Sequence, residues 1–305
     1  MTLPDKAASG HPTSSLLLAG TISFLLGMQL SIGVHENVPT PKVVDASAVF
    51  EPYTGKSTGW HQVDVFYGES SLLSRRVNGS LWTSQAKQDQ IVFRLLGKGG
   101  YFLDLAANDA TFLSNTYSLE THHGWNGLCM EANPQYWSGL ASRRCQVVGA
   151  VLGHQTMEEI QFKYGTKAPG QKQGDLSDSG ILGGIVNPAF DNEYPRSNDK
   201  IEPRFTVTLE DVFRRYKVPS LIDYLSLDVE GAEMYIMSSF PFDRYRIKII
   251  TAERPTGTLM ALFRKNGYVL IGQLSDFGET LWCHESIKPT LDLSGITLFD
   301  YYGIF

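Results

Sequence analysis

Cysteine and basic side chains are scarce in this sequence. Only three of the 305 residues are cysteine, too few for the disulfide framework that stabilises many small secreted domains. Lys and Arg total 26 against 32 Asp and Glu, which gives a formal net charge of −6. An acidic surface repels phosphates, so nucleic acid is excluded as an expected partner. The hydrophobic fraction of 42% is enough for a large core and excludes global disorder.

Charged residues are missing from residues 12–34, which contain no Asp, Glu, Lys, Arg or His. At about 1.5 Å per residue, a helix of this length spans the roughly 30 Å hydrocarbon layer of a membrane. We therefore predict an N-terminal tail and membrane signal-anchor over residues 1–34. Lys6 is balanced by Asp5, so flanking charge gives little orientation signal. A cleaved signal peptide and a buried soluble helix stay open as alternatives.

Residues 35–80 are rich in Pro, Ser, Thr and Gly and show no sustained period, which indicates a stem or linker. Asn78 begins an Asn-Gly-Ser triplet, the acceptor pattern for N-glycosylation. This layout predicts a single-pass membrane glycoprotein of the Golgi or endoplasmic reticulum. Its catalytic domain, residues 81–305, is expected to lie in the lumen.

Apolar runs and helical patterns alternate along residues 81–305. Strands are predicted over residues 101–105, 127–131, 145–152, 160–164, 221–228, 247–253, 268–274 and 279–284. Helices are predicted over residues 110–122, from Pro134 onward, and over 208–218, 231–239 and 259–265. Alternating strands and helices indicate an α/β fold with a mainly parallel sheet. The last two strands are expected to form an antiparallel hairpin, and residues 165–200 a long loop.

Acidic residues stand at or near the ends of four predicted strands. They are Asp104, Glu131, Asp228 and Glu253. In open α/β sheets, ligands bind beyond the carboxyl ends of the strands. One such acid is readily explained as a helix cap, but four together predict a ligand site.

The turn after the first strand distinguishes two classes of ligand. Glu131 follows Asp104 by 27 positions, and an acid at the end of the second strand suits the ribose of NAD or of S-adenosylmethionine. A dinucleotide also needs glycines in the first turn, so that backbone amides approach its pyrophosphate. Residues 104–110 contain no glycine, and Asp109 would repel a phosphate. An acidic turn suits a cationic sulfonium and an ammonium group, which favours S-adenosylmethionine over NAD.

Several strings of this sequence resemble the FkbM-type S-adenosylmethionine-dependent methyltransferases. The most specific are Asp-Val-Glu-Gly-Ala-Glu at 228–233 and the block from Ser-Asn-Thr at 114–116 to Gly-Trp at 124–125. Other matching strings lie at residues 84–89, 102–109, 126–134 and 208–211. The resemblance implies a Rossmann-like methyltransferase fold with a mainly parallel, seven-stranded sheet and a terminal antiparallel hairpin. It also implies S-adenosylmethionine as the cofactor and a hydroxyl group as the methyl acceptor.

The resemblance also implies roles for matching residues. The turn from Asp104 to Asn108 would wrap the methionine part of the cofactor, Glu131 would bind the ribose, and Asp228 with Glu230 would face the reacting end. The implied cofactor-binding residues are Asp104, Ala106, Asn108, Glu131, Asn133, Ala150 and Asp228, and the implied catalytic residues are Asp228 and Glu230. The chain departs from the family pattern at Ala106 and Ala110, where Gly is common, and at Ala132, where Pro is common.

Methyl transfer to a hydroxyl is an in-line displacement that depends mostly on proximity and alignment. The hydroxyl must also lose its proton, and we assign that step to Asp228 or Glu230. The alternative role of this pair is to bind the cofactor ammonium group or a divalent cation, although no metal site is predicted. His284 is a further candidate base, for which an exposed strand histidine is the plainer interpretation. The expected acceptor is a glycan or a small molecule.

Cys129 and Cys145 fall on neighbouring predicted strands. We predict buried free thiols, with a disulfide as the alternative.

Two other functions of the chain stay open. One is a catalytically silent methyltransferase-like module that serves binding or trafficking at a membrane, which the changes at Ala106 and Ala110 favour. The other is a Golgi-type glycosyltransferase, which the lack of an Asp-x-Asp pair at a strand end disfavours.

Overall fold

The computed structural model describes residues 60–62, 81–164, 183–190 and 200–299, all within one compact unit, Lys56–Phe305. The predicted signal-anchor over residues 1–34 and the triplet at Asn78 lie outside the described residues. Among the residues described, no helix is both long and apolar enough to cross a membrane. The anchor and the lumenal placement therefore stay predictions.

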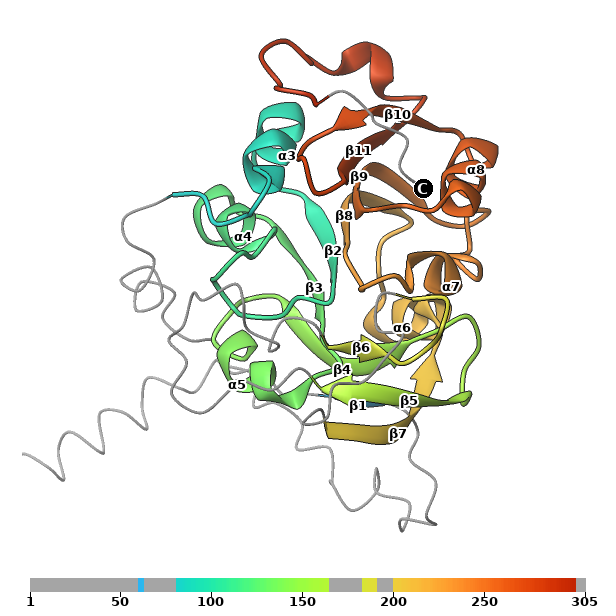
Figure 1. Ribbon diagram of the computed structural model, residues 1–305. Coiled ribbons are helices and arrows are strands. Elements are labelled where there is room, and N and C mark those ends of the chain that lie inside the picture. The colour runs from blue at the N-terminus through green and yellow to red at the C-terminus, as the bar shows by residue number, and fades with distance from the viewer. Residues whose placement is uncertain (1–59, 63–80, 165–182, 191–199, 300–305) are drawn as a thin grey trace, which may run out of the picture. The chain divides into compact units, whose positions relative to one another are not determined.

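The described residues form one large sheet (Figure 1). Ten strands lie in the order β10-β11-β9-β8-β2-β3-β4-β7-β5-β6, and an eleventh, β1, pairs with β4 off this path. The bounds are β1 Trp60–Gln62, β2 Tyr101–Leu105, β3 Asn126–Met130, β4 Gln146–Leu152, β5 Glu159–Tyr164, β6 Gly184–Ile185, β7 Lys200–Val207, β8 Leu221–Leu227, β9 Arg246–Glu253, β10 Tyr268–Gln273 and β11 Glu279–His284.

The sheet has more strands than the seven that the resemblance implies. β7 extends it by pairing parallel with β4, and β5 and β6 follow in antiparallel register. The count of seven is therefore wrong, whereas the mainly parallel centre and the hairpin of β10 and β11 are confirmed. The sequence pattern hides β7 because Pro203 interrupts it and Lys200, Glu202 and Arg204 occupy alternate positions. Proline and charged side chains both count against a strand assignment.

The strand order reverses between β2 and β8. From β2 the chain adds β3 and β4 on one side, and it later places β8 and β9 on the other. All five strands are parallel, so their carboxyl ends share one edge of the sheet. A reversal of this kind leaves a crevice outside the carboxyl ends of the two central strands, where ligands bind in open α/β sheets.

Helices cover both faces of the central strands. Figure 1 shows α3, α4 and α5 on one side of β2 and β8, and α6, α7 and α8 on the other. The bounds are α3 Gln88–Leu96, α4 Tyr117–His123, α5 Trp137–Leu140, α6 Leu209–Tyr216, α7 Glu233–Met237 and α8 Gly257–Lys265, with short 3-10 helices η2 Pro134–Tyr136 and η3 Lys288–Thr290. Successive residues of β2 alternate between the two packed faces, with Phe102 on the first and Leu103 on the second.

Two helices begin later than their sequence pattern predicts. The helix expected over residues 110–122 starts only at Tyr117, because Asp109 accepts the backbone amides of Thr111 and Phe112 in a tight turn. The helix expected over residues 231–239 is reduced to α7. Positive φ angles at Leu113 and Glu230 precede these helices, and an L-residue in that conformation cannot continue a right-handed helix.

The start of α6 follows the predicted cap. The Thr208 side chain accepts the backbone amide of Asp211 at 3.2 Å, as the Thr-Leu-Glu-Asp string predicts. By contrast, α3 was not predicted at all. Its buried side includes Gln88 and Asp89 as well as Ile91 and Val92. Because two of these buried residues are polar, the sequence lacks the apolar stripe that would indicate a helix.

Cys129 and Cys145 form a disulfide, so the prediction of free thiols is wrong. Cys129 lies opposite Val147 in the register of β3 and β4, and Cys145 precedes Val147 by two residues. Side chains two apart point to the same face of a sheet, which puts the cysteines on one face with their Cα atoms 5.9 Å apart. That separation suits a disulfide. Cys283 is free and buried.

We expect alkylation of the unfolded, unreduced chain to label Cys283 alone, as read by peptide mass spectrometry. Reduction before labelling should make all three cysteines reactive. Because the bond closes a loop of 16 residues, replacing both Cys129 and Cys145 by Ala should lower the free energy of unfolding by about 3 kcal/mol. Cys283→Ala removes a buried sulfur without removing a cross-link and should cost markedly less. Labelling of three cysteines without reduction would contradict the pairing.

Candidate active site

A cavity of about 280 Å³ opens at the carboxyl ends of β2, β3, β4, β8 and β9. It lies at the topological switch point, where the fold places a ligand. All the cofactor-binding and catalytic residues that the family resemblance implies line this cavity, namely Asp104, Ala106, Asn108, Glu131, Asn133, Ala150, Asp228 and Glu230. The structure therefore brings them together, although they come from four segments of the chain.

The turn after β2 adopts an unusual backbone conformation. Ala106 and Asn108 have φ angles of 61° and 52°, in the left-handed region that favours glycine and tolerates asparagine. Ala106 is exposed on the cavity wall. The backbone amide of Ala107 donates to the carbonyl of Met130 at 3.0 Å, which ties the turn to the end of β3.

Glu131 holds this turn through its side chain. Its Oε2 accepts the backbone amide of Asn108 at 2.8 Å, and its Oε1 accepts that of Asn133 at 2.6 Å. A carboxylate offers about four lone-pair sites, so each oxygen keeps capacity for another donor. Burial is the main cause that raises the pKa of Glu131 to about 7, and the nearby Asp104 carboxylate also raises it. The two backbone hydrogen bonds act in the opposite direction and lower the pKa.

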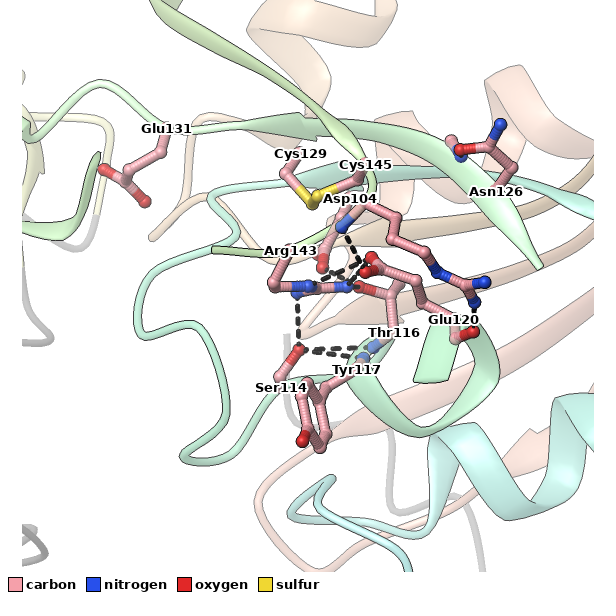
Figure 2. The surroundings of a disulfide bond; sticks show 12 residues. Asp104, Ser114, Thr116, Tyr117, Glu120, Asn126, Cys129, Glu131, Arg143 and Cys145 are labelled. Carbon is pink, nitrogen blue, oxygen red and sulfur yellow. Dashed lines mark hydrogen bonds and ion pairs between the residues drawn. A yellow bond between two sulfur atoms is a disulfide. The ribbon is translucent and has the colours of Figure 1, made fainter. Parts of the chain in front are cut away.

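Asp104 is positioned by a buried ion pair (Figure 2). Thr116 donates its hydroxyl proton to Asp104 Oδ2, and Arg143 Nη2 donates to Thr116 Oγ1 at 2.8 Å. The same guanidinium binds Glu120 Oε2 through Nε and Nη2, at 3.1 and 3.0 Å, and Ser114 Oγ through Nη1 at 3.1 Å. Burial raises the pKa of Asp104, and Arg143 opposes that rise.

The disulfide lies beside this network (Figure 2). Arg143 is two residues before Cys145, and the intervening backbone amide of Arg144 donates to Glu120 Oε1. The bond to Cys129 therefore fixes the segment that carries Arg143 to the strand next to β2. In this way the cross-link supports the side chain that orients Asp104.

Four carboxylates meet at the opposite part of the cavity, at the ends of β8 and β9 and the start of β11. They belong to Asp228, Glu230, Glu253 and Glu279. Arg254 supplies positive charge among the described lining residues, with its Nη2 at 2.9 Å from Glu253 and 3.8 Å from Glu230.

The Asp228 and Glu253 carboxyls interact closely, so that the charge of Glu253 disfavours ionisation of Asp228. Burial, followed by the charges of Glu253, Glu230 and Glu279, raises the pKa of Asp228 well above its usual range. Like-charge carboxyls in contact share protons in this way. Asp228 thus holds a proton more readily than an isolated aspartate does.

Sequence reasoning missed Glu279, Arg254 and Asn115, which also line the cavity. A signal for Glu279 existed, because the predicted hairpin runs antiparallel beside β9. Its first residue therefore falls opposite Glu253 at the carboxyl edge. The same register puts His284 at the far end of β11, paired with Tyr268 and away from the cavity lining. The structure thus gives no support to His284 as a base.

The comparisons with known proteins agree with this geometry. A family model for the methyltransferase FkbM domain matches residues 104–270, more than half of the chain. This match confirms the resemblance seen in the sequence strings, and it contains Asp104, Glu131, Asp228, Glu230 and Glu253. Comparison with curated proteins and with solved structures found no match.

The raised pKa values of two buried acids predict how stability changes with pH. Burial raises the pKa of Glu279 to about 8 and that of Glu131 to about 7, from 4.5 for each. The folded state therefore binds these protons more tightly, and their contribution to stability is lost as pH rises from about 4.5 to about 8. Glu279→Gln mimics the protonated acid and should make the free energy of unfolding fall less steeply over this range.

Urea unfolding at pH 5, 6.5 and 8 measures that slope. Glu159→Gln is the matched control, because Glu159 is exposed at the start of β5 outside the cavity. It should leave the slope unchanged. An equal slope for Glu279→Gln and the unsubstituted chain would show that Glu279 does not titrate over this range.

Proposed function

The chain belongs to the FkbM methyltransferase domain family, and from this premise we propose that it transfers a methyl group from S-adenosylmethionine to a hydroxyl group. The acceptor we propose is a glycan or a small molecule. The observation that carries the proposal is the carboxylate-lined cavity at the switch point, in which Glu131 joins the first turn to the end of β3.

The residues present fit S-adenosylmethionine. Both Glu131 oxygens keep lone pairs for ribose hydroxyls after accepting one backbone amide each. The first turn contains no glycine cradle for a pyrophosphate. Carboxylates of Asp104 and Asp228 line the same cavity and complement a cationic sulfonium and an ammonium group. Asn133 and Ala150 complete the wall on the proposed adenosine side.

When bound, the cofactor supplies an electrophilic methyl group. The chain's own contribution is to orient the acceptor and to remove its proton. Asp228 is suited to that role, because its raised pKa brings it toward the pH at which a general base works best. Glu230 lies 3.8 Å from the Arg254 guanidinium, and we assign it to hold the acceptor or to share the proton. The carboxylate-rich wall favours a neutral or cationic acceptor over an anionic one.

We also propose that the domain lies in an oxidising lumen behind an N-terminal anchor. Structural disulfides are rare where cytosolic reductants keep thiols reduced, and the Cys129–Cys145 bond supports this placement. The uncharged residues 12–34 and the glycosylation triplet at Asn78 are further support from the sequence.

Calorimetry of the full chain tests the cofactor. S-adenosylhomocysteine should bind and NAD should not. Glu131→Ala should weaken S-adenosylhomocysteine by about 1.5–3 kcal/mol, because hydrogen bonds to a charged acceptor are lost. Glu131→Gln, which keeps an acceptor for one backbone amide, should lose less, and Glu159→Ala should lose nothing. Binding of NAD in preference to S-adenosylhomocysteine would overturn the assignment.

Turnover tests the acid pair. Acceptors are found first, by transfer of labelled methyl groups to a panel of monosaccharides, glycoprotein glycans and small alcohols. On an acceptor that the unsubstituted chain methylates, Asp228→Asn and Glu230→Gln should each reduce turnover by at least about 100-fold. At least one variant should keep near-normal affinity for S-adenosylhomocysteine.

If these acids only cap a turn, both variants should melt earlier yet keep turnover per folded molecule. Tight cofactor binding without any methylation across the panel would instead favour the catalytically silent module. Ala106, exposed on the cavity wall where the family commonly has glycine, is the position to examine in that event.

A further inference from the structure

Asn115 lies on the cavity wall between the turn after β2 and the start of α4. It is the middle residue of the Ser-Asn-Thr string, and its neighbours Ser114 and Thr116 belong to the Arg143 network. Those neighbours hold the backbone on either side of Asn115. Its own side chain makes no hydrogen bond to Arg143 and turns instead toward Ser226.

Hydrogen bonds fix which end of the Asn115 amide faces which partner. The Nδ2 group donates to Ser226 Oγ on β8 at 3.0 Å. Ser226 lies opposite Asp104 in the register of β8 and β2, and its hydroxyl acts to lower the pKa of that carboxyl. The nitrogen of the amide therefore faces Ser226, and the oxygen is the end of the amide directed away from it.

The Oδ1 atom of Asn115 is buried and has no hydrogen-bond partner in the described structure. Most buried polar atoms in native proteins have a partner, and an unpaired one costs about 1–3 kcal/mol. Asp104, which lines the same cavity, already accepts the Thr116 hydroxyl and offers Oδ1 no donor. Asn115 therefore brings one unpaired acceptor to the lining of the cavity.

We propose that Asn115 Oδ1 accepts a hydrogen bond from the ammonium group at the amino-acid end of the cofactor. This inference rests on the proposed function and names a further binding residue for it. A protonated amine carries three donors and a positive charge. It therefore satisfies the unpaired oxygen and complements the Asp104 carboxylate at the same time.

Two ligands that differ in the ammonium group test the proposed hydrogen bond to Asn115 Oδ1. S-adenosylhomocysteine has the amino-acid end, whereas 5′-methylthioadenosine keeps the adenosine and the thioether but lacks the ammonium group. Calorimetry of the full chain with Asn115→Ala should show about tenfold or greater loss of S-adenosylhomocysteine affinity, the effect of one hydrogen bond from a charged donor. Affinity for 5′-methylthioadenosine should stay within about twofold, since that ligand never reaches the oxygen.

Two further variants make the test specific. Asn115→Asp keeps an acceptor oxygen and should preserve the preference for S-adenosylhomocysteine, even if Asn115→Ala proves unstable. Asn126→Ala is the matched control, because Asn126 is exposed at the start of β3, away from the cavity lining. It should change neither affinity.

The possible outcomes separate the two proposals. An unchanged preference in Asn115→Ala, equal losses for both ligands, or a lost preference in Asn115→Asp would overturn the role of Asn115 alone. Failure of the unsubstituted chain to bind either ligand would overturn the proposed function itself.

Discussion

The buried ion pair of Arg143 and Glu120 is the interaction on which the rest of the site depends. Both side chains are almost wholly removed from water, an arrangement that is tolerated only when each charge is paired and fully hydrogen-bonded. Here the guanidinium also reaches Ser114 and Thr116 and lies over the ring of Phe102. Because Arg143 donates to Thr116, the threonine hydroxyl is left to donate to Asp104. The ion pair thereby sets the orientation of the first acid of the cavity.

The cavity itself follows from placing carboxylates at one edge of a parallel sheet. The acids lie at strand ends: Asp104 and Glu253 close β2 and β9, Glu131 and Asp228 follow β3 and β8, and Glu279 begins the antiparallel β11. The charged groups therefore gather along one edge of the sheet. Burial and mutual repulsion then raise the pKa values of Asp228, Glu131 and Glu279. Such a cavity is poor at holding phosphates and suited to a cationic ligand, which agrees with membership of a methyltransferase family.

The sequence was informative wherever local pattern and chemistry agreed. The buried strands of the parallel centre, the Thr208 cap and the acids at strand ends follow from short-range signals. The structure places the implied cofactor-binding and catalytic residues around one cavity, but not the candidate base His284. Features that depend on distant partners could not be predicted in this way. The disulfide required the register of β3 and β4, and Glu279 required the pairing of β11 with β9. The late starts of α4 and α7 depend on left-handed residues that sequence periodicity does not reveal.

The central claim is that this cavity binds S-adenosylmethionine with its ribose at Glu131 and its amino-acid end at Asp104. A crystal structure of the chain with S-adenosylhomocysteine tests it most directly. The account predicts both ribose hydroxyls on the Glu131 carboxylate, the ammonium group between Asp104 and Asn115, and the sulfur atom facing Asp228. A ligand bound outside the cavity, or bound in it with the ribose away from Glu131, would contradict the account.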